Sequence, residues 1–191
     1  AHVDANRRAV PPELLNALGD AGEVGGIDMA GPGLRRPDLA ARDEAHRRLV
    51  ELKNSGMPLP VNLKNQVIYY VGPAPSKPGQ VINSAGPTTG KRMDKYTKDM
   101  LELGVIGMIG KGERGEETKK LIKGKAIYMA ALGGVGAKQA KSIVRQDIIA
   151  FDDAGMEALR KFEVKDFPVI VIHDLEGNDA YDVGRRTWEN N

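Results

Sequence analysis

Hydroxyl and basic side chains are concentrated in residues 84–96, which read SAGPTTGKRMDKY. Hydroxyls, glycine-flanked backbone N–H groups and cationic side chains together form the kind of site that binds an anion. A nucleotide phosphate loop has the pattern G-x-x-x-x-G-K-[ST], and this stretch departs from it at two positions. Ala85 stands where the first glycine would be, and Arg92 follows Lys91 where a magnesium-binding hydroxyl is needed. ATP and GTP are therefore disfavoured, and the sequence predicts another anion.

The same stretch predicts a carboxylate or phosphate site at the start of a helix. If Thr88 or Thr89 caps a helix that runs to Leu103, the N–H groups of its first turn are free and the helix dipole favours an anion. The planar guanidinium of Arg92 can grip a carboxylate through two parallel hydrogen bonds. A threonine hydroxyl beside that anion would act as a hydrogen-bond partner or a proton relay. The simpler alternative is a capped helix with solvated basic residues, although basic side chains in a first turn oppose the dipole.

Two further glycine-rich turns follow predicted strands. Gly110 and Gly112 leave Lys111 with a free backbone on both sides, which permits close approach to a ligand, although an exposed turn lysine is the simpler alternative. Residues 133–136 mimic a dinucleotide fingerprint, but Gln139 stands at the third glycine position. We interpret this second stretch as a tight strand-to-helix turn.

Composition narrows the classes of function. The chain has 191 residues, enough to bury a core, and its 28 basic against 26 acidic residues give a formal charge of +2. With this balance and only 5% aromatic residues, a nucleic-acid partner is not expected. The chain has no cysteine, so it supplies no disulfide, thiolate nucleophile or cysteine ligand for a metal. Without a signal-peptide pattern or an apolar run near the roughly 20 residues of a membrane helix, we expect a soluble, cytoplasmic protein.

The chain is predicted to change character at residue 37. Residues 1–37 are rich in glycine and proline and are expected to be loosely ordered, apart from a short helix at 13–18. From residue 38 to 191 helical and strand patterns alternate. The predicted strands span 66–71, 105–109, 126–132, 148–151 and 167–172, and the predicted helices span 39–52, 93–103, 116–123, 137–143 and 156–162. This alternation predicts an α/β fold with a mixed or mostly parallel sheet flanked by helices.

Several motifs in a fixed order carry a resemblance to one known family. They are Ala41-Arg42-Asp43-x-Ala45-His46, Gly86-Pro87-Thr88-Thr89-x-x-Arg92-Met93-Asp94-x-Tyr96, Gly110-Lys111-Gly112, Gly155-Met156-Glu157-Ala158 and Asp174-x-x-Gly177-Asn178-Asp179. Over about residues 41–181 the chain resembles the C-terminal part of class I (iron–sulfur) fumarases. It is equally similar in pattern to the β subunits of two-chain fumarate hydratases and L-tartrate dehydratases.

The resemblance implies a fold, an activity and a partner. It implies a swivelling β/β/α domain and a hydro-lyase that adds water reversibly to fumarate to give L-malate, with L-tartrate dehydration to oxaloacetate as the alternative. It also implies a [4Fe–4S] cluster ligated by three cysteines of an α subunit and not by this chain. The β chain would be inactive alone, and αβ pairs would associate further. A stand-alone carboxylate-binding module without chemistry is the alternative from another class.

Site residues follow from the resemblance position by position. Thr88, near the carbon-bound proton of the substrate, and Lys111, at the rim of the site, are implied as catalytic, and the implied substrate-binding residues are Arg42, Thr89, Arg92 and His46. No metal ligand is implied on this chain. The simpler alternative for Arg42 and His46 is a solvated helix face, because they lie one turn apart among other charged residues. The chain departs from the family at residues 19–39, where glycine, arginine and proline replace a strand-forming segment with a G-D-x-V pattern. This departure bears on the orientation of Arg42.

Overall fold

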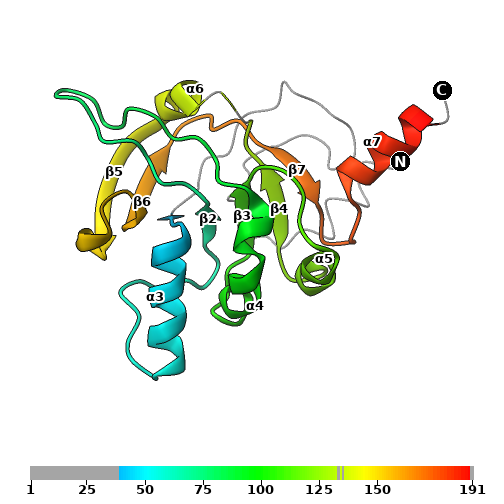
Figure 1. The fold of residues 1–191 in the computed structure, drawn as a ribbon, viewed down its shortest axis with the longest axis horizontal. Helices are drawn as coiled ribbons and strands as arrows, with labels where there is room; N and C mark the ends of the chain where they lie inside the picture. The colour runs from blue at the N-terminus through cyan, green and yellow to red at the C-terminus, as the bar shows by residue number, and fades with distance from the viewer. Residues whose placement is uncertain (1–38, 133, 135, 190–191) are drawn as a thin grey trace.

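The computed structural model describes residues 39–189 apart from 133 and 135. Within this part of the chain, seven strands form one mixed sheet in the order β5-β6-β1-β2-β3-β4-β7 (Figure 1). The strands are β1 (Leu39–Ala40), β2 (Val67–Tyr69), β3 (Gly107–Gly110), β4 (Ile127–Ala130), β5 (Ile143–Ala150), β6 (Leu159–Val164) and β7 (Ile170–His173). The α-helices are α3 (Asp43–Asn54), α4 (Asp94–Glu102), α5 (Glu116–Ile122), α6 (Gly136–Lys141) and α7 (Ala180–Glu189), and the 3-10 helices are η1 (Gly90–Met93) and η2 (Asp152–Glu157).

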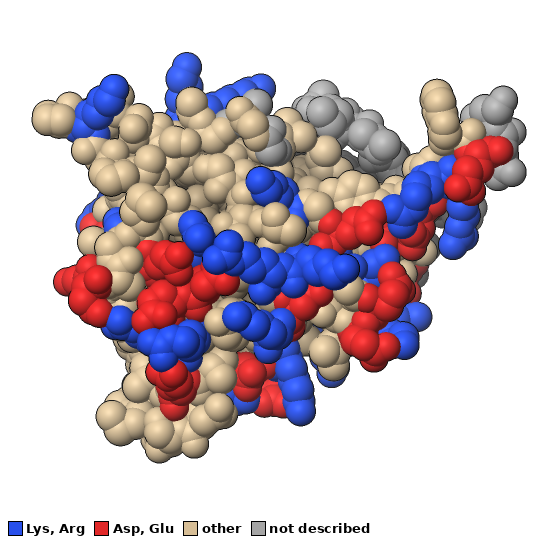
Figure 2. All heavy atoms as spheres, viewed as in Figure 1, with Lys and Arg blue, Asp and Glu red and all other residues tan. Residues whose placement is uncertain are grey.

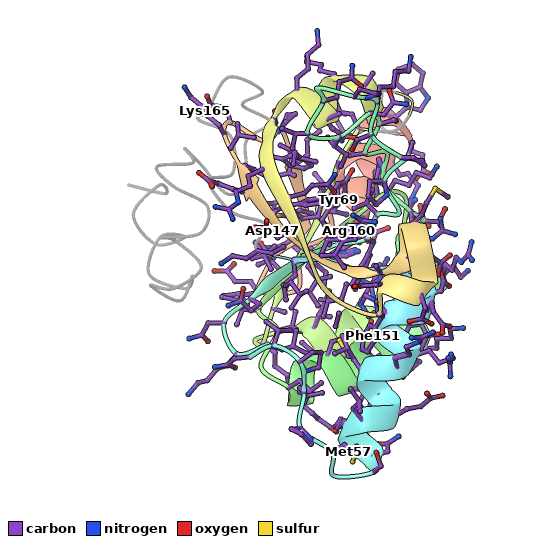
Figure 3. All side chains as sticks on the ribbon, turned by 90° about the vertical axis from the view of Figure 1, so that its left-hand side faces the viewer. Met57, Tyr69, Asp147, Phe151, Arg160 and Lys165 are labelled. Atoms are coloured by element: carbon purple, nitrogen blue, oxygen red, sulfur yellow. The ribbon has the colours of Figure 1, made fainter. Side chains whose placement is uncertain are left out.

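Four parallel strands form the centre of the sheet. β1 pairs with β2, β2 with β3 and β3 with β4, all in parallel. β6 and β7 flank this group in antiparallel pairing with β1 and β4. β5 forms a long antiparallel ribbon with β6, and η2 joins the two strands (Figure 3). Because the central strands are parallel, the segments that follow β1, β2 and β3 all leave the sheet at the same edge, the edge at which ligands bind in open α/β sheets.

Both faces of the central strands are buried, as is usual for parallel strands. Successive side chains of a strand point to opposite faces, so Val67 and Tyr69 belong to one apolar cluster and Ile68 to the other. Helices α3, α4 and α5 lie over the face that carries Ile68 (Figure 1). Leu49 of α3 is among the residues that they bury against it. The predicted α/β class with a mixed, helix-flanked sheet is confirmed.

The helix predicted at 39–52 begins later than expected. Leu39 and Ala40 form strand β1 and are fully buried between β2 and β6, and helix α3 starts only at Asp43. Their apolar side chains fit the helical periodicity equally well, and pairing with two neighbouring strands decides in favour of the strand. The consequence is functional, because Arg42 lies directly between the end of β1 and the start of α3.

The predicted helix at 156–162 is wrong. Residues 159–164 form β6, in which Leu159, Phe162 and Val164 are buried while Lys161 and Glu163 face solvent. Hydrogen bonding to β1 on one side and to β5 on the other selects the strand over the short helical pattern. The preceding η2 is interrupted at Gly155, which has φ of 59° and a non-helical ψ of −113°.

Two elements in the C-terminal part of the chain differ from the prediction. Helix α7 was not predicted, and it projects from the body of the domain after β7 (Figure 1). β5 begins at Ile143, earlier than the predicted strand at 148–151, so that α6 is shorter than the predicted helix at 137–143. The predicted helix at 13–18 and the predicted N-terminal segment at 1–37 lie outside the described residues.

Candidate active site

The loop that carries Thr88 is held between the carboxyl ends of two central strands. The N–H of Thr88 donates to the carbonyl of Tyr70, the residue after β2, at 2.7 Å. On the other side Lys111, the residue after β3, donates its N–H to the carbonyl of Thr88 at 3.0 Å. Gly90 then donates to the carbonyl of Lys111 at 2.8 Å. Thr88 and Lys111 therefore occupy adjacent, fixed places at the carboxyl edge of the sheet.

Close packing against Tyr128 explains the glycines in and beside this loop. A Cβ atom on Gly90 would overlap the Tyr128 hydroxyl and lie 2.8 Å from Cδ of Arg114. A Cβ atom on Gly110 would lie 2.9 Å from the same hydroxyl. The Tyr128 hydroxyl itself donates to the carbonyl of Gly112 at 3.0 Å. The glycines thus allow the backbone on either side of Lys111 to approach the buried tyrosine.

Arg114 links the end of β3 to the helix that follows the loop. It is only 2% exposed, and its Nε donates to Oδ1 of Asp94 at 2.5 Å while its Nη2 donates to the hydroxyl of Thr97 at 2.6 Å. The second oxygen of Asp94 accepts the N–H of Gly115 at 2.7 Å. The guanidinium also lies 4.8 Å from the centre of the Tyr128 ring. Sequence analysis missed Arg114, because nothing in its local pattern separates it from exposed basic residues.

The predicted helix cap is not formed. Thr89 precedes a 3-10 turn, makes no side-chain hydrogen bond to its N–H groups, and is followed by an α-helix only from Asp94. The N–H of Arg92 is already used, because it donates to the carbonyl of Thr89 at 3.2 Å. The N–H groups of Gly90 and Arg92 are therefore not available to an anion, and the candidate anion contacts that we consider are side chains.

One carboxylate joins the two arginines of the predicted site. Oδ1 of Asp43 accepts a hydrogen bond from Nε of Arg92 at 2.8 Å, and Oδ2 accepts one from Nε of Arg42 at 3.4 Å. Burial would raise the pKa of Asp43, but the hydrogen bond and the charge of Arg92, together with a smaller contribution from Arg42, hold that pKa below its ordinary value. The bond from Asp43 in turn raises the pKa of Arg92. A second carboxylate, Glu157, pairs with Nη2 of Arg42 at 3.2 Å.

Three side chains at this edge have no partner among residues 39–132, 134 and 136–189. They are Thr88, which is partly buried, and Thr89 and Lys111, which are exposed. The side chain of Arg92 is 53% exposed and that of Arg42 24%. In Figure 2 a band of Lys and Arg side chains crosses the middle of the visible face, with Asp and Glu side chains on either side of it. The segments that meet at this edge therefore carry hydroxyl, ammonium and guanidinium side chains that are at least partly exposed.

His46 lies behind Arg42 and not beside it. Its ring is fully buried between Tyr70 and Tyr96, with ring centres 5.4 and 5.5 Å away, and its Nδ1 lies 2.8 Å from the carbonyl of Arg42. That contact makes Nδ1–H the donor, and Nε2 has no partner within the described part of the chain. Burial lowers the pKa of His46 to about 4, so the ring is neutral at neutral pH. This buried position gives no support to the predicted role of His46 in substrate binding. The contact of Nδ1 with the carbonyl of Arg42 indicates instead that His46 holds the backbone of Arg42 in place.

The start of α6 supports the start of the Thr88 loop. Ala85 donates its N–H to the carbonyl of Gly136 at 3.1 Å, and a Cβ atom on Gly136 would lie 2.6 Å from the hydroxyl of Ser84. With its amide oriented to match its neighbours, the buried Gln139 accepts from the N–H of Leu132 at 3.2 Å and donates to the carbonyl of Ala85 at 3.1 Å. The glycine at 136 therefore serves close packing of two loops.

Comparison with known proteins places this arrangement in a family. The family described as "Fumarase C-terminus" matches residues 35–184, which include all of the predicted site residues. The chain belongs to this family. It is 40% identical to fumarate hydratase 2 of Leishmania major over 147 residues, which are 75% of this chain and 26% of that protein. It is also 40% identical to the anaerobic class I fumarate hydratase of Escherichia coli K12, over 75% of this chain and 27% of that protein.

The chain also matches a relative of more similar length. It is 37% identical to a putative L(+)-tartrate dehydratase subunit beta of Methanocaldococcus jannaschii, over 78% of this chain and 80% of that protein. The chain thus spans about a quarter of the length of the fumarate hydratases and most of the tartrate dehydratase β subunit.

This chain does not have the ligands for the [4Fe–4S] cluster that the resemblance to class I fumarases implies. Such clusters are held by cysteine thiolates, and the chain has no cysteine. The described residues also contain no group of three or more His, Asp or Glu side chains placed to hold a metal ion. Among the helices of the described residues, none is long and apolar enough to cross a membrane.

Proposed function

We propose that this chain is the β subunit of a hydro-lyase that interconverts fumarate and L-malate by reversible hydration. The observation that carries the proposal is the grouping of Arg42, Thr88, Arg92 and Lys111 at the carboxyl edge of the sheet in a member of the fumarase C-terminus family. Fumarate and malate are small dicarboxylates, and this edge carries two guanidinium groups, an ammonium group and the Thr88 hydroxyl, which has no partner within the described part of the chain.

Each of these side chains has a role that suits its chemistry. Arg42 and Arg92 would bind one substrate carboxylate, because guanidinium groups match carboxylates through paired hydrogen bonds. Lys111 would hold the substrate from the rim of the site. Hydration adds a hydroxyl to one alkene carbon and a proton to the next, and Thr88 would pass the proton at the second carbon. A threonine hydroxyl is a weak base at neutral pH, so we expect it to act with a stronger base from a partner chain.

The cluster and the remaining substrate contacts would come from outside this chain. Because the chain has no cysteine, we place the [4Fe–4S] ligands on a cysteine-bearing α subunit. The chain alone would then be inactive, and αβ pairs would associate into a larger oligomer. An L-tartrate dehydratase β subunit is the second candidate, favoured by the similarity over 80% of the putative tartrate dehydratase β subunit of Methanocaldococcus jannaschii.

The test is an anaerobic reconstitution. The chain is produced together with a cysteine-bearing α subunit, the cluster is rebuilt, and fumarate and L-tartrate are supplied in parallel assays. Fumarate turnover that requires both chains would support the proposal, and turnover of L-tartrate alone would select the second candidate. If an intact cluster is present and neither acid reacts, the hydro-lyase proposal is wrong. Binding of a dicarboxylate without turnover would then favour a non-catalytic carboxylate-binding module.

A further inference from the structure

The two arginines of the site are joined to two carboxylates. Asp43 uses both of its oxygens, one on Nε of Arg92 at 2.8 Å and one on Nε of Arg42 at 3.4 Å. Glu157 also uses both, one on Nη2 of Arg42 at 3.2 Å and one on the backbone N–H of Glu44 at 2.9 Å. The carboxylates therefore form a continuous chain of contacts from Arg92 through Arg42 to the first turn of α3.

Glu157 reaches this chain from a distant part of the sequence. It lies 113 residues beyond Glu44, at the end of η2, and η2 packs on the start of α3. Phe151, the residue after β5, lies near the N-terminal part of α3 (Figure 3). Met57 lies at the opposite end, beyond the C-terminus of the helix. Because the cap residue Arg42 makes no side-chain cap of its own, the Glu157 carboxylate serves as an external cap for α3 and also contacts Arg42.

Among the described residues, the contacts leave both terminal nitrogens of Arg92 and one terminal nitrogen of Arg42 without a partner. Arg92 uses only Nε, so its two terminal nitrogens have no partner among the described residues. Arg42 uses Nε and Nη2, and its Nη1 lies over Gly72, where a Cβ atom would come within 3.2 Å. Gly72 follows β2 at the carboxyl edge, so the free donor of Arg42 lies at the same edge as Thr88.

Fixing two arginines before the substrate arrives has a clear physical benefit. A free arginine side chain loses rotamer freedom when it binds a ligand, and groups already held in place lose less. Each carboxylate here holds the Nε side of the fork or one terminal nitrogen and does not occupy the whole guanidinium. The arrangement orients the arginines and leaves Nη1 of Arg42 and both terminal nitrogens of Arg92 for a substrate carboxylate.

We propose that Asp43 and Glu157 are positioning residues that hold Arg42 and Arg92 as one preformed receptor for a substrate carboxylate. This inference rests on the proposed function for the identity of the ligand, a four-carbon dicarboxylate. It adds two acidic residues to a site for which the sequence predicted only basic residues, threonine hydroxyls and one histidine.

The chain offers a matched control for testing these acids. Asp153 of η2 pairs with Arg48 of α3, with Oδ1 accepting from Nη1 at 2.8 Å, so it also joins η2 to α3 through an acid and an arginine. Asp153→Asn removes that pair without touching Arg42 or Arg92. The variants to compare in the reconstituted αβ complex are Asp43→Asn, Asp43→Glu, Glu157→Gln and Asp153→Asn.

Positioning predicts a loss of affinity without a loss of assembly. For Asp43→Asn we expect KM for malate and the dissociation constant of succinate, measured by calorimetry, to rise about tenfold, as expected when preorganisation is lost. The kcat should fall less than threefold, and the melting temperature should match that of Asp153→Asn. Glu157→Gln should weaken succinate binding in the same direction, and Asp43→Glu should recover part of the affinity because it keeps the charge.

Three results would overturn the inference. One is succinate affinity in Asp43→Asn within twofold of the unmodified complex. Another is a loss of affinity that Asp153→Asn shares in full, and the third is a loss that follows the melting temperature, which would assign the acids to stability alone. Succinate binding is independent of turnover. A complex that turns over neither acid and still loses succinate affinity in Asp43→Asn would refute the proposed function while supporting the positioning role, and a complex that binds no succinate at all would refute both.

Discussion

Gly90→Ala should separate the packing of the Thr88 loop from its chemistry. A Cβ atom at position 90 meets two side chains that cannot move freely: the Tyr128 hydroxyl, which donates to Gly112, and Cδ of Arg114, whose head group is bound to Asp94 and Thr97. The loop backbone must therefore shift, and the hydrogen bond from Gly90 to Lys111 must lengthen with it. Because Thr88 and Lys111 are joined through the same ladder, both predicted catalytic residues would be displaced.

The expected cost is that of an overpacked core position, about 1–3 kcal/mol in the free energy of unfolding. For a chain of this size, each kcal/mol corresponds to about 2–4 °C in melting temperature. Gly86→Ala is the matched control in the same loop, because a Cβ atom there has only ordinary contact with Cα of Gly136 at 3.9 Å. That substitution should change the unfolding free energy by less than about 0.5 kcal/mol.

Urea unfolding followed by circular dichroism measures both variants, and a double-mutant cycle identifies the clash. Tyr128→Phe removes the hydroxyl that the new Cβ atom would meet, at the cost of about 1 kcal/mol for the lost hydrogen bond to Gly112. The combined variant should be less destabilised than the sum of the two single variants. Equal stability of Gly90→Ala and Gly86→Ala, or strict additivity with Tyr128→Phe, would refute this account of the loop.

Three other predictions concern the site and its support. Thr88→Ala should lower kcat of the reconstituted pair by about 10²–10⁴ while KM changes less than about threefold, and Thr88→Ser should recover much of the rate, as steady-state kinetics would show. Arg92→Ala should both lower kcat and raise KM, whereas wild-type KM in that variant would exclude Arg92 from substrate binding. The unfolded chain protonates His46 near 6.5 and the folded chain only near 4, so the unfolded state binds more protons between these values and stability should fall by roughly 3 kcal/mol as the pH falls from about 6.5 to about 4. His46→Gln should flatten that part of the stability profile in urea titrations at several pH values, and an unchanged slope would contradict the burial argument.

The fold class could be predicted because local signals agree with it in most segments. The β-branched run at 67–71 and the apolar run at 127–130 are buried on both faces, and the helices between strands carry one apolar side. The failures occur where tertiary pairing decides between two local patterns. Leu39–Ala40 and Leu159–Val164 both fit a helical face, and both become strands because β1 and β6 hydrogen-bond to each other.

The site could be predicted only in part for a different reason. Thr88, Arg92 and Lys111 stand beside glycine and proline in short motifs, so their local sequence marks them. Arg114 has no such local mark, and Glu157 stands in a glycine motif that assigns it no role. The importance of both comes from partners far away along the chain, Asp94 for Arg114 and Arg42 for Glu157. A carboxylate that orients an arginine cannot be distinguished from a solvated surface acid until the two are seen together.

The charges of the site indicate that a partner chain would be needed for substrate binding as well as for the cluster. Arg42, Arg92 and Lys111 bring three positive charges to the carboxyl edge, and Asp43 and Glu157 bring two negative charges, so the group carries a net charge of +1. A four-carbon dicarboxylate carries two negative charges. If such a ligand is buried here, as the proposed function requires, its second carboxylate needs a partner as well, and a further cationic or strongly donating group would have to supply it. A partner chain that closes over this edge would supply that group together with the base that Thr88 requires, which makes one docking event responsible for affinity, proton transfer and exclusion of water.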